Sequence, residues 1–371
     1  MSLERLSISH FLEQCPQGLL LDVRSPAEYA HAHQPGAVSL PLFTDEERKV
    51  VGTAYKQVSR QAAIKIGLDY FGPNMRPMVE KVENLLAEKN KEGVSKDNTV
   101  YLYCWRGGMR SSAVAWLLDL YGFKVKVLSG GYKAYRAWAL KINAFTYRLQ
   151  LIGGFTGSGK TELLKALAQK GELVVDLEAL ANHKGSAFGN IGLPAQPSQE
   201  MFENLLAQNL HHLHQKAVRE STNGNVLTDS LAWPEKPIWV EDESQRIGLI
   251  NIPPSFWQTM RQSPIYFLDI PFEERLAYLT TEYGSLDKEK MQGAIERISK
   301  RLGGLETKNA ISLLAEGNTA ECFRILLRYY DKHYQKGLYN RQNLLSLLNK
   351  ISCASVSTAN IQFLLQKPTV A

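Results

Sequence analysis

The sequence predicts an α/β protein in which two units of parallel sheet and helices are followed by a helical C-terminal region. Short apolar runs alternate with helical stretches across residues 1–140, as in a parallel sheet with crossover helices. The alternation restarts near residue 146 and continues to about residue 285. Residues 286–371 read as mostly helical. We therefore expect domains at 1–140 and 146–285, with 286–371 packed on the second domain.

The first unit begins with a short strand and a capped helix. Residues 18–23, "GLLLDV", have the apolar composition of a buried strand. A helix should follow, with Ser25 as its N-cap and Pro26 at its first position. The run "GAVSLPL" predicts a second strand. Residues 44–92 are polar and have the composition of helices. The segment "FGPNMRP" is expected to interrupt this helical stretch.

The rest of this unit repeats the alternation. The run "NTVYLYC" predicts a strand, and "SSAVAWLLDLYG" predicts a helix that ends at Gly122. A further strand, "KVKVL", precedes a turn into a helix in "SGGYKAYRAWAL". The connections between these parallel strands should be right-handed.

The second unit opens with a strand, a glycine-rich loop and a helix, "YRLQLIGGFTGSGKTELLKALAQKG". Later strands are expected in "ELVVDL", "GNVLTDS", "IWVED" and "SPIYFLDI". C-terminal helices are expected in "ERISKRLGGLETKNAISLL", "TAECFRILLRYYDKHY" and "RQNLLSLLNKIS".

The composition is that of an ordinary globular protein. The 371 residues are 44% hydrophobic and 22% charged, and the net charge of +6 is compatible with a polyanionic partner such as RNA. Four cysteines lie far apart, without a CxxC pair or a His/Cys cluster at metal spacing. This pattern predicts reduced thiols in a cytoplasmic protein without a structural metal. The N-terminus lacks the apolar core of a signal peptide, and no apolar run approaches the roughly 20 residues that span a bilayer, so we expect no membrane partner.

The first candidate site is the loop "CWRGGMR", which lies between a strand and a helix. Cationic neighbours and a helix N-terminus favour the thiolate form of cysteine, and Cys104 has Arg106, Arg110 and a following helix. Two glycines let backbone N–H groups turn inward to form an anion cradle. We interpret these residues as a catalytic nucleophile with an oxyanion pocket. Two chemistries share this pattern: carriage of sulfur or selenium on the thiol, and hydrolysis of a phosphate ester.

The second candidate site is "GFTGSGKT", which satisfies the phosphate-binding pattern G-x-x-x-x-G-K-[ST] between a strand and a helix. Lys160 is expected to bind the terminal phosphate, and the Thr161 hydroxyl to ligate Mg²⁺ where a metal accompanies the phosphate. A carboxylate at the end of a second strand should help, but Asp176, Asp229 and Asp242 are equal candidates, and a diphosphate would fit the cradle as well as a nucleotide. The predicted phosphate-binding residues are Gly154, Gly157, Ser158, Gly159, Lys160 and Thr161.

Polar residues crowd two further strand ends of the second unit. Because ligands of open α/β sheets bind at the carboxyl ends of strands, we predict a substrate site there. We assign His183, Lys184, Glu241 and Arg246 to it, and the same strand ends also carry Asp176, Glu178, Ser186 and Glu243. Basic residues of the C-terminal helices could contact a nucleic-acid backbone or form a solvated face, and the aromatic residues of "YYDKHY" could stack bases or pack in the core.

The first unit resembles the rhodanese family. It carries "DVRSPAEY", "HQPGA" and "LSGG", which match the family's segments in order. The resemblance implies that Asp22, Arg24, Glu28 and His33 are scaffold residues. The loop "CWRGGMR" is a residue longer than common rhodanese loops and resembles that of rhodanese-fold phosphatases, so a pocket for a tetrahedral phosphate-like group is expected.

The chain as a whole resembles the tRNA 2-selenouridine synthase family, because "CWRGGMRS", "GGFTGSGKT", "DLEALANHKGSAFG", "WVEDESQRIG" and "LLRYYDKHY" occur in order. The resemblance implies a transferase that exchanges the sulfur of wobble 2-thiouridine in tRNA anticodons for selenium from selenophosphate. It also implies transfer of a geranyl group from geranyl diphosphate to that sulfur. Cys104 matches the family's essential cysteine. The implied partners are tRNA and an enzyme that supplies selenophosphate.

Other functions remain open on the residues alone. A P-loop kinase or NTPase with a regulatory rhodanese-like module would use only the second loop, and a Cys-x5-Arg phosphatase only the first. A non-catalytic RNA-binding protein would need neither. For a geranyl chain, Phe155, Phe188, Trp233 and Trp257 could form pocket walls, although core packing is the ordinary role of such residues.

Overall fold

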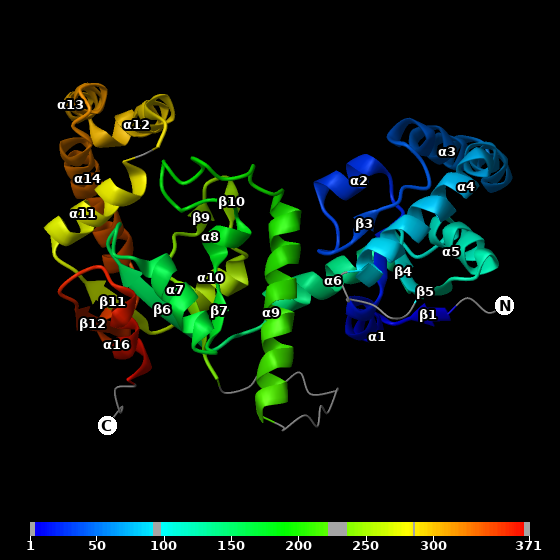
Figure 1. Cartoon of the computed structure of the whole chain (residues 1–371), viewed down its shortest axis with the longest axis horizontal. Coiled ribbons are helices and arrows are strands. Elements are labelled where there is room, and N and C mark those ends of the chain that lie inside the picture. Colours follow the sequence, from blue (N-terminus) through cyan, green and yellow to red (C-terminus); the bar gives the residue numbers. More distant parts are fainter. Residues whose placement is uncertain (1–3, 92–97, 222–235, 285, 367–371) are drawn as a thin grey trace. The chain divides into compact units, whose positions relative to one another are not determined.

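The computed structural model describes residues 4–91, 98–221, 236–284 and 286–366. Its contacts divide the chain into two compact units (Figure 1). Unit 1 comprises residues 1–141 with Glu203–Leu205, and unit 2 comprises residues 142–202 and 206–371. Within the described ranges, no helix is both long and apolar enough to cross a bilayer.

Unit 1 contains a sheet of five parallel strands in the order β1-β5-β4-β2-β3. Its central strand β4 is buried along its whole length, as expected when helices cover both faces of a parallel sheet. The predicted strands are therefore confirmed, and β1 is added at one edge. The strands are β1 (Glu4–Leu6), β2 (Leu19–Asp22), β3 (Val38–Ser39), β4 (Thr99–Tyr103) and β5 (Lys124–Leu128).

Most helices of unit 1 follow the sequence prediction, but the helix at Ile8–Gln14 was not foreseen and one expected break does not occur. Residues 71–77 do not interrupt the helical region, because α4 runs through them with Pro73 and Pro77 inside the helix. Both prolines are exposed, whereas Phe71 and Val82 on the same helix are buried in the core, so apolar packing on one face holds the helix together. The helices are α1 (Ile8–Gln14), α2 (Pro26–His31), α3 (Asp45–Gln57), α4 (Arg60–Lys91), α5 (Met109–Tyr121) and α6 (Gly131–Asn143).

Unit 2 contains a second parallel sheet of five strands in the order β12-β11-β6-β8-β7. One edge was not foreseen, because "RQNLLSLLNKIS" was expected to be helical. It forms one helical turn and then β12, which pairs with β11 from Ile265↔Leu348 to Asp269↔Ser352. The strands are β6 (Leu149–Gly154), β7 (Leu173–Val175), β8 (Ile238–Glu241), β11 (Ile265–Asp269) and β12 (Leu348–Ser352), with a hairpin of β9 (Arg246–Ile247) and β10 (Ile250–Asn251).

The helices of unit 2 confirm the predicted fold class, including the helical C-terminal region. Helices α11, α12, α13 and α14 share an apolar core that includes Leu279, Ile295 and Phe323. The strand expected in "GNVLTDS" lies outside the described residues. The helices are α7 (Lys160–Gln169), α8 (Leu177–Leu180), α9 (Gln199–Ser221), α10 (Pro254–Arg261), α11 (Phe272–Tyr283), α12 (Lys288–Leu302), α13 (Gly304–Ala315), α14 (Thr319–Tyr339), α15 (Leu344–Leu347) and α16 (Ile361–Leu365).

Candidate functional site

The cysteine loop of unit 1 spans residues 104–108, between the end of β4 and the start of α5. Gly107 has a φ of +65°, which favours glycine. A Cβ at this position would lie 2.6 Å from the carbonyl oxygen of Leu128. The loop therefore packs directly against the backbone that follows β5, and this close approach explains why glycine is required at position 107.

Backbone hydrogen bonds and one arginine hold the cysteine loop in place. The amide of Tyr132 donates to the carbonyl oxygen of Cys104 at 2.8 Å, and the amide of Lys133 donates to that of Trp105 at 3.0 Å. Arg5 in β1 donates to the carbonyl oxygen of Gly107 at 2.6 Å and to Oγ of Ser112 at 2.8 Å. Sequence reasoning missed Arg5, because it lies about a hundred residues before the loop and belongs to no recognisable motif.

The thiol of Cys104 is buried, with 3% of the residue exposed. Its Sγ lies 3.2 Å from Oγ of Ser111 and donates to it, and Ser111 in turn donates to the carbonyl oxygen of Gly108 at 3.0 Å. The sequence predicted a nucleophile that faces an anion pocket. The structure places Cys104 at the expected strand end, but in a closed form of the loop.

The two arginines of the loop have different surroundings. Arg106 is exposed, whereas Arg110 donates to Oε2 of Glu28 at 2.7 Å. Arg48 also pairs with Glu28, at 2.9 Å. Burial opposes ionisation of Glu28, but the hydrogen bond and charge of Arg110 prevail and hold its pKa below the ordinary value. The charge of Arg110 is therefore partly neutralised by a carboxylate of α2.

The residues expected to be scaffold in unit 1 form buried polar contacts. Arg24 pairs with Asp22 at 2.6 Å, donates to the carbonyl oxygen of Ala32 at 2.6 Å, and lies 3.8 Å from the centre of the Tyr132 ring. Nδ1 of His33 lies 2.9 Å from the carbonyl oxygen of Tyr29. This network holds the segments after β2 and β5 that frame the cysteine loop.

The phosphate loop of unit 2 spans residues 154–161, between β6 and α7. Gly157 has a φ of +81°, and a Cβ there would lie 2.8 Å from Cγ of Leu279. Nζ of Lys160 donates to the carbonyl oxygen of Gly154 at 3.2 Å. The amide of Ser158 donates to the carbonyl oxygen of Phe155 at 3.1 Å, so the loop uses internally one of the amides that we expected at the phosphate.

Residues of the C-terminal helical region support this loop. Arg275 on α11 donates to the carbonyl oxygen of Thr156 at 3.0 Å and pairs with Asp331 of α14 at 2.7 Å. The hydroxyl of Tyr334 accepts from the amide of Gly154 at 3.3 Å and donates to Asp242 at 2.8 Å. The helical region is thus tied to the phosphate loop by hydrogen bonds as well as by apolar packing.

Three carboxylates gather beside the phosphate loop. Glu178, Glu241 and Glu243 each place an oxygen within 4.8 Å of the others. Burial and, for Glu178 and Glu243, repulsion by neighbouring carboxylates raise the pKa of all three, while the charge of Lys160 opposes the rise. Oε1 of Glu241 is buried and has no hydrogen-bond partner among the described residues. From the sequence, Glu241 was assigned to the substrate site and Glu178 and Glu243 were placed near the same strand ends, but the meeting of the three carboxylates in one cluster was not predicted.

The predicted substrate residues share one large cavity with the phosphate loop. His183, Lys184, Glu241 and Arg246 all line this cavity, whose volume is about 1460 Å³. His183 is 8% exposed, and burial followed by the charge of Arg297 lowers its pKa. Nζ of Lys184 lies 3.4 Å from Glu282 and 5.2 Å from the centre of the Tyr283 ring. The polar clusters singled out from the sequence are thus brought together in the structure.

The structure distinguishes the three candidate aspartates. Asp176 accepts from the amide of Ala179 at 2.8 Å and so caps α8. Asp242 is held by Tyr334 and by Arg341, the latter at 2.5 Å. Asp229 lies outside the described residues. Glu241 at the end of β8 is therefore the described acidic residue best placed to face Lys160 and Thr161, both of which lower its pKa.

Basic and aromatic residues of the C-terminal helices form another wall of the cavity. Arg297 and Arg301 from α12 line it, as do Tyr329 and His333 from α14. Arg324, in contrast, is held by Glu273 at 2.5 Å. Arg301 is therefore available at the cavity wall, whereas the side chain of Arg324 is engaged by a carboxylate of α11.

Comparisons with known proteins agree with this geometry. A family model described as "tRNA 2-selenouridine synthase AAA domain" matches residues 147–356, and one described as "Rhodanese-like domain" matches residues 8–137. Proteins named tRNA 2-selenouridine synthase from Nitrosomonas europaea and Bdellovibrio bacteriovorus are each 34% identical, and the alignments cover 86% and 87% of this chain and 88% and 89% of the relatives. One from Psychromonas ingrahamii is 31% identical, with 90% of both chains covered. The chain therefore belongs to the tRNA 2-selenouridine synthase family.

Proposed function

We propose that this protein modifies tRNA in two steps and replaces the sulfur of wobble 2-thiouridine with selenium. In the first step, the sulfur attacks C1 of geranyl diphosphate, so that an S–C bond forms and diphosphate leaves with the electrons of the C–O bond. In the second step, selenium of selenophosphate adds to C2 of the base and the geranyl thiolate leaves. Water then cleaves the Se–P bond and releases phosphate.

The single observation that carries the proposal is the joint lining of one cavity by the phosphate loop and the predicted substrate residues. A diphosphate leaving group carries developing negative charge, which Lys160 and the start of α7 are suited to stabilise. The cavity also offers Arg297 and Arg301, whose cationic side chains suit an RNA phosphate. Unit 2 is therefore assigned to geranyl transfer.

A divalent cation fits beside the phosphate loop. Three carboxylates within 4.8 Å of one another repel unless they are protonated or bind a cation, and Oε1 of Glu241 lacks a hydrogen-bond partner among the described residues. Thr161 and Glu241 would hold Mg²⁺, which supplies positive charge to a diphosphate.

Unit 1 is assigned to the selenium step. The cysteine loop combines a thiol, two glycines and the exposed Arg106, a set of groups suited to a tetrahedral anion such as selenophosphate. Because Cys104 is buried in the closed loop, its participation requires displacement of residues 105–108. We infer tRNA and a selenophosphate-supplying enzyme as partners, and the cytoplasm as the place of action.

The test is mass spectrometry of nucleosides from 2-thiouridine-containing tRNA after incubation with the purified protein. With geranyl diphosphate and Mg²⁺, we expect the S-geranyl nucleoside. With selenophosphate added, we expect 2-selenouridine. A 2-thiouridine that remains unchanged under both conditions would refute the proposal.

Nucleoside triphosphate hydrolysis is a second candidate function, because an acidic cluster facing a phosphate loop also suits a magnesium–nucleotide complex. Phosphate release from ATP or GTP, measured without RNA, decides between the two. Rapid turnover without tRNA would favour the hydrolase, whereas turnover at the level of a Lys160→Ala variant would exclude it.

A further inference from the structure

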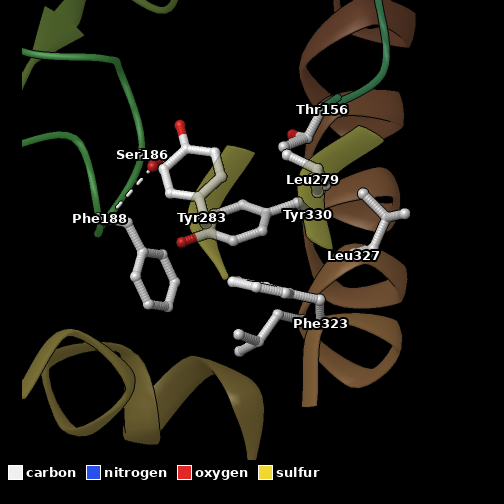
Figure 2. A pocket seen from close by; sticks show the side chains of 9 residues that line it. Thr156, Ser186, Phe188, Leu279, Tyr283, Phe323, Leu327 and Tyr330 are labelled. Carbon is white, nitrogen blue, oxygen red and sulfur yellow. Dashed lines mark hydrogen bonds between the residues drawn. The ribbon is translucent and has the colours of Figure 1, made fainter. Parts of the chain in front are cut away.

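A small apolar recess in unit 2 has no role in the chemistry described so far. Figure 2 shows its walls: Phe188 projects from the loop after α8, Leu279 and Tyr283 come from α11, and Phe323 and Leu327 come from α14. Thr156 of the phosphate loop stands at its rim. An apolar recess that is open on one side therefore lies against the loop that we propose to bind a diphosphate.

The recess opens toward the large cavity. Thr156, Ser186, Tyr283 and Tyr330 line both spaces. A ligand that is held at the phosphate loop can therefore extend into the recess along one shared rim. Thr156 is the point of continuity, because it belongs to the loop between β6 and α7 and also borders the apolar walls.

Two of the polar groups at the rim already accept a hydrogen bond. The hydroxyl of Tyr330 accepts from the amide of Ala187 at 3.2 Å, and Oγ of Ser186 accepts from the amide of Phe188 at 3.2 Å. Phe188 and Phe323 lie edge to face, with ring centres 6.3 Å apart. A nucleobase would present several donors and acceptors to such walls, and burying them unpaired would cost free energy. A hydrocarbon has no such cost.

We propose that this recess binds the end of the hydrocarbon chain of a prenyl diphosphate whose diphosphate lies in the phosphate loop. This inference rests on the proposed function and adds the location of the chain. The recess is small, with a volume of about 30 Å³. On the same measure, a single buried water needs about 10–15 Å³. The recess therefore holds the branched tip of the chain, and the preceding carbons lie along the rim at Thr156.

The test compares two probes, geranyl diphosphate and inorganic pyrophosphate, by isothermal titration calorimetry with the full-length protein and Mg²⁺. Leu327 is 1% exposed and lines the recess from α14, so Leu327→Trp should fill it. We expect the affinity for geranyl diphosphate to fall about tenfold or more, since the lost contacts correspond to about two methylene groups. The affinity for pyrophosphate should stay unchanged. Leu305→Trp adds the same ring at an exposed position of α13 and should change neither affinity.

The outcomes separate the two proposals. If Leu327→Trp binds geranyl diphosphate as the wild type does, the recess is not the site, and the proposed function stands. If the wild type binds neither probe, the proposed function fails at the phosphate loop and this inference fails with it. If Leu327→Trp loses pyrophosphate binding through misfolding, Phe188→Ala decides. It should weaken geranyl diphosphate binding about fivefold by removing one wall, and unchanged binding would overturn the inference.

Discussion

The cysteine loop of unit 1 and the phosphate loop of unit 2 have the same local architecture but different surroundings. Each follows a parallel strand, contains at least one glycine with positive φ and leads into a helix. The cysteine loop is closed over a thiol that is 3% exposed, and Glu28 partly neutralises Arg110 beside it. The phosphate loop borders a cavity of about 1460 Å³ and faces a cluster of carboxylates.

This difference shows that a strand–loop–helix segment sets the backbone geometry of the loop. It does not determine whether the loop is buried or open to a ligand. In unit 1, backbone hydrogen bonds from Tyr132 and Lys133 and the side chain of Arg5 keep the loop closed. In unit 2, Arg275 and Tyr334 hydrogen-bond to the backbone of the loop, whose residues 156–161 line the large cavity. The first loop buries its thiol, whereas the second already borders a large cavity.

The strongest way to break the comparison is to remove the thiol. Cys104→Ala should abolish incorporation of selenium into tRNA while geranylation stays within about twofold of the wild type, because geranyl transfer is assigned to the other loop. Mass spectrometry of the nucleosides measures both products. Cys15→Ala removes another buried cysteine of unit 1 and should leave both products unchanged. Simultaneous loss of both products in a folded Cys104→Ala variant would contradict the division of labour.

Removal of the cation from the second loop should have the next largest effect. Lys160→Ala should weaken geranyl diphosphate binding about 10- to 100-fold, since hydrogen bonds to charged groups contribute about 1.5–3 kcal/mol. Calorimetric titration measures the change. Lys170→Ala removes the same charge at the other end of α7 and serves as the control. An affinity that Lys160→Ala leaves unaltered would show that the phosphate loop does not bind the diphosphate.

The carboxylate cluster predicts a pH dependence that belongs to unit 2 alone. Because burial and repulsion raise the pKa of Glu178 above its ordinary value of 4.5, the folded protein binds more protons than the unfolded chain above this pH. The metal-free protein should therefore lose stability as pH rises through the raised values, and Mg²⁺ should restore it. Glu178→Gln should raise the thermal midpoint at pH 8 by about 2–4 °C, equivalent to roughly 1 kcal/mol.

Differential scanning fluorimetry at pH 6 and pH 8, with and without Mg²⁺, measures this effect. Glu172→Gln, a glutamate outside the cluster in the turn before β7, is the matched control and should leave the midpoint unchanged at both pH values. If the wild-type thermal midpoint rises between pH 6 and pH 8 without metal, ionisation of the carboxylate cluster does not destabilise the folded protein.

The smallest expected effect concerns the closure of the first loop. Arg5→Ala removes two hydrogen bonds to the loop and α5, worth about 1 kcal/mol together in an exposed setting. The rate at which iodoacetamide alkylates Cys104 should rise about fivefold, as followed by peptide mass spectrometry. Arg76→Ala, which removes an exposed pair with Glu80 on α4, is the control. Equal alkylation rates would show that Arg5 does not hold the loop closed.

Local patterns in the sequence predicted much of the fold and part of the site. The strand and cap residues around Ser25, the helix end at Gly122 and the phosphate loop follow from short-range rules, and the structure contains them. The contribution of Arg5 and the meeting of Glu178, Glu241 and Glu243 in one cluster could not be predicted, because they depend on contacts between distant segments. The same is true of β12. Its residues were expected to be helical, but they pair with β11 along the whole strand. Burial of Cys104 likewise depends on the segment after β5.

The position of β12 has a consequence for how the chain acquires its shape during synthesis. All strands of unit 1 precede residue 129, so its sheet can be completed while the ribosome is still translating unit 2. The sheet of unit 2 waits for residues 348–352, and Val356 then packs close to Gly159 in the phosphate loop. Nascent chains should therefore complete the sheet of unit 1 before the sheet of unit 2 and the surroundings of its phosphate loop are finished.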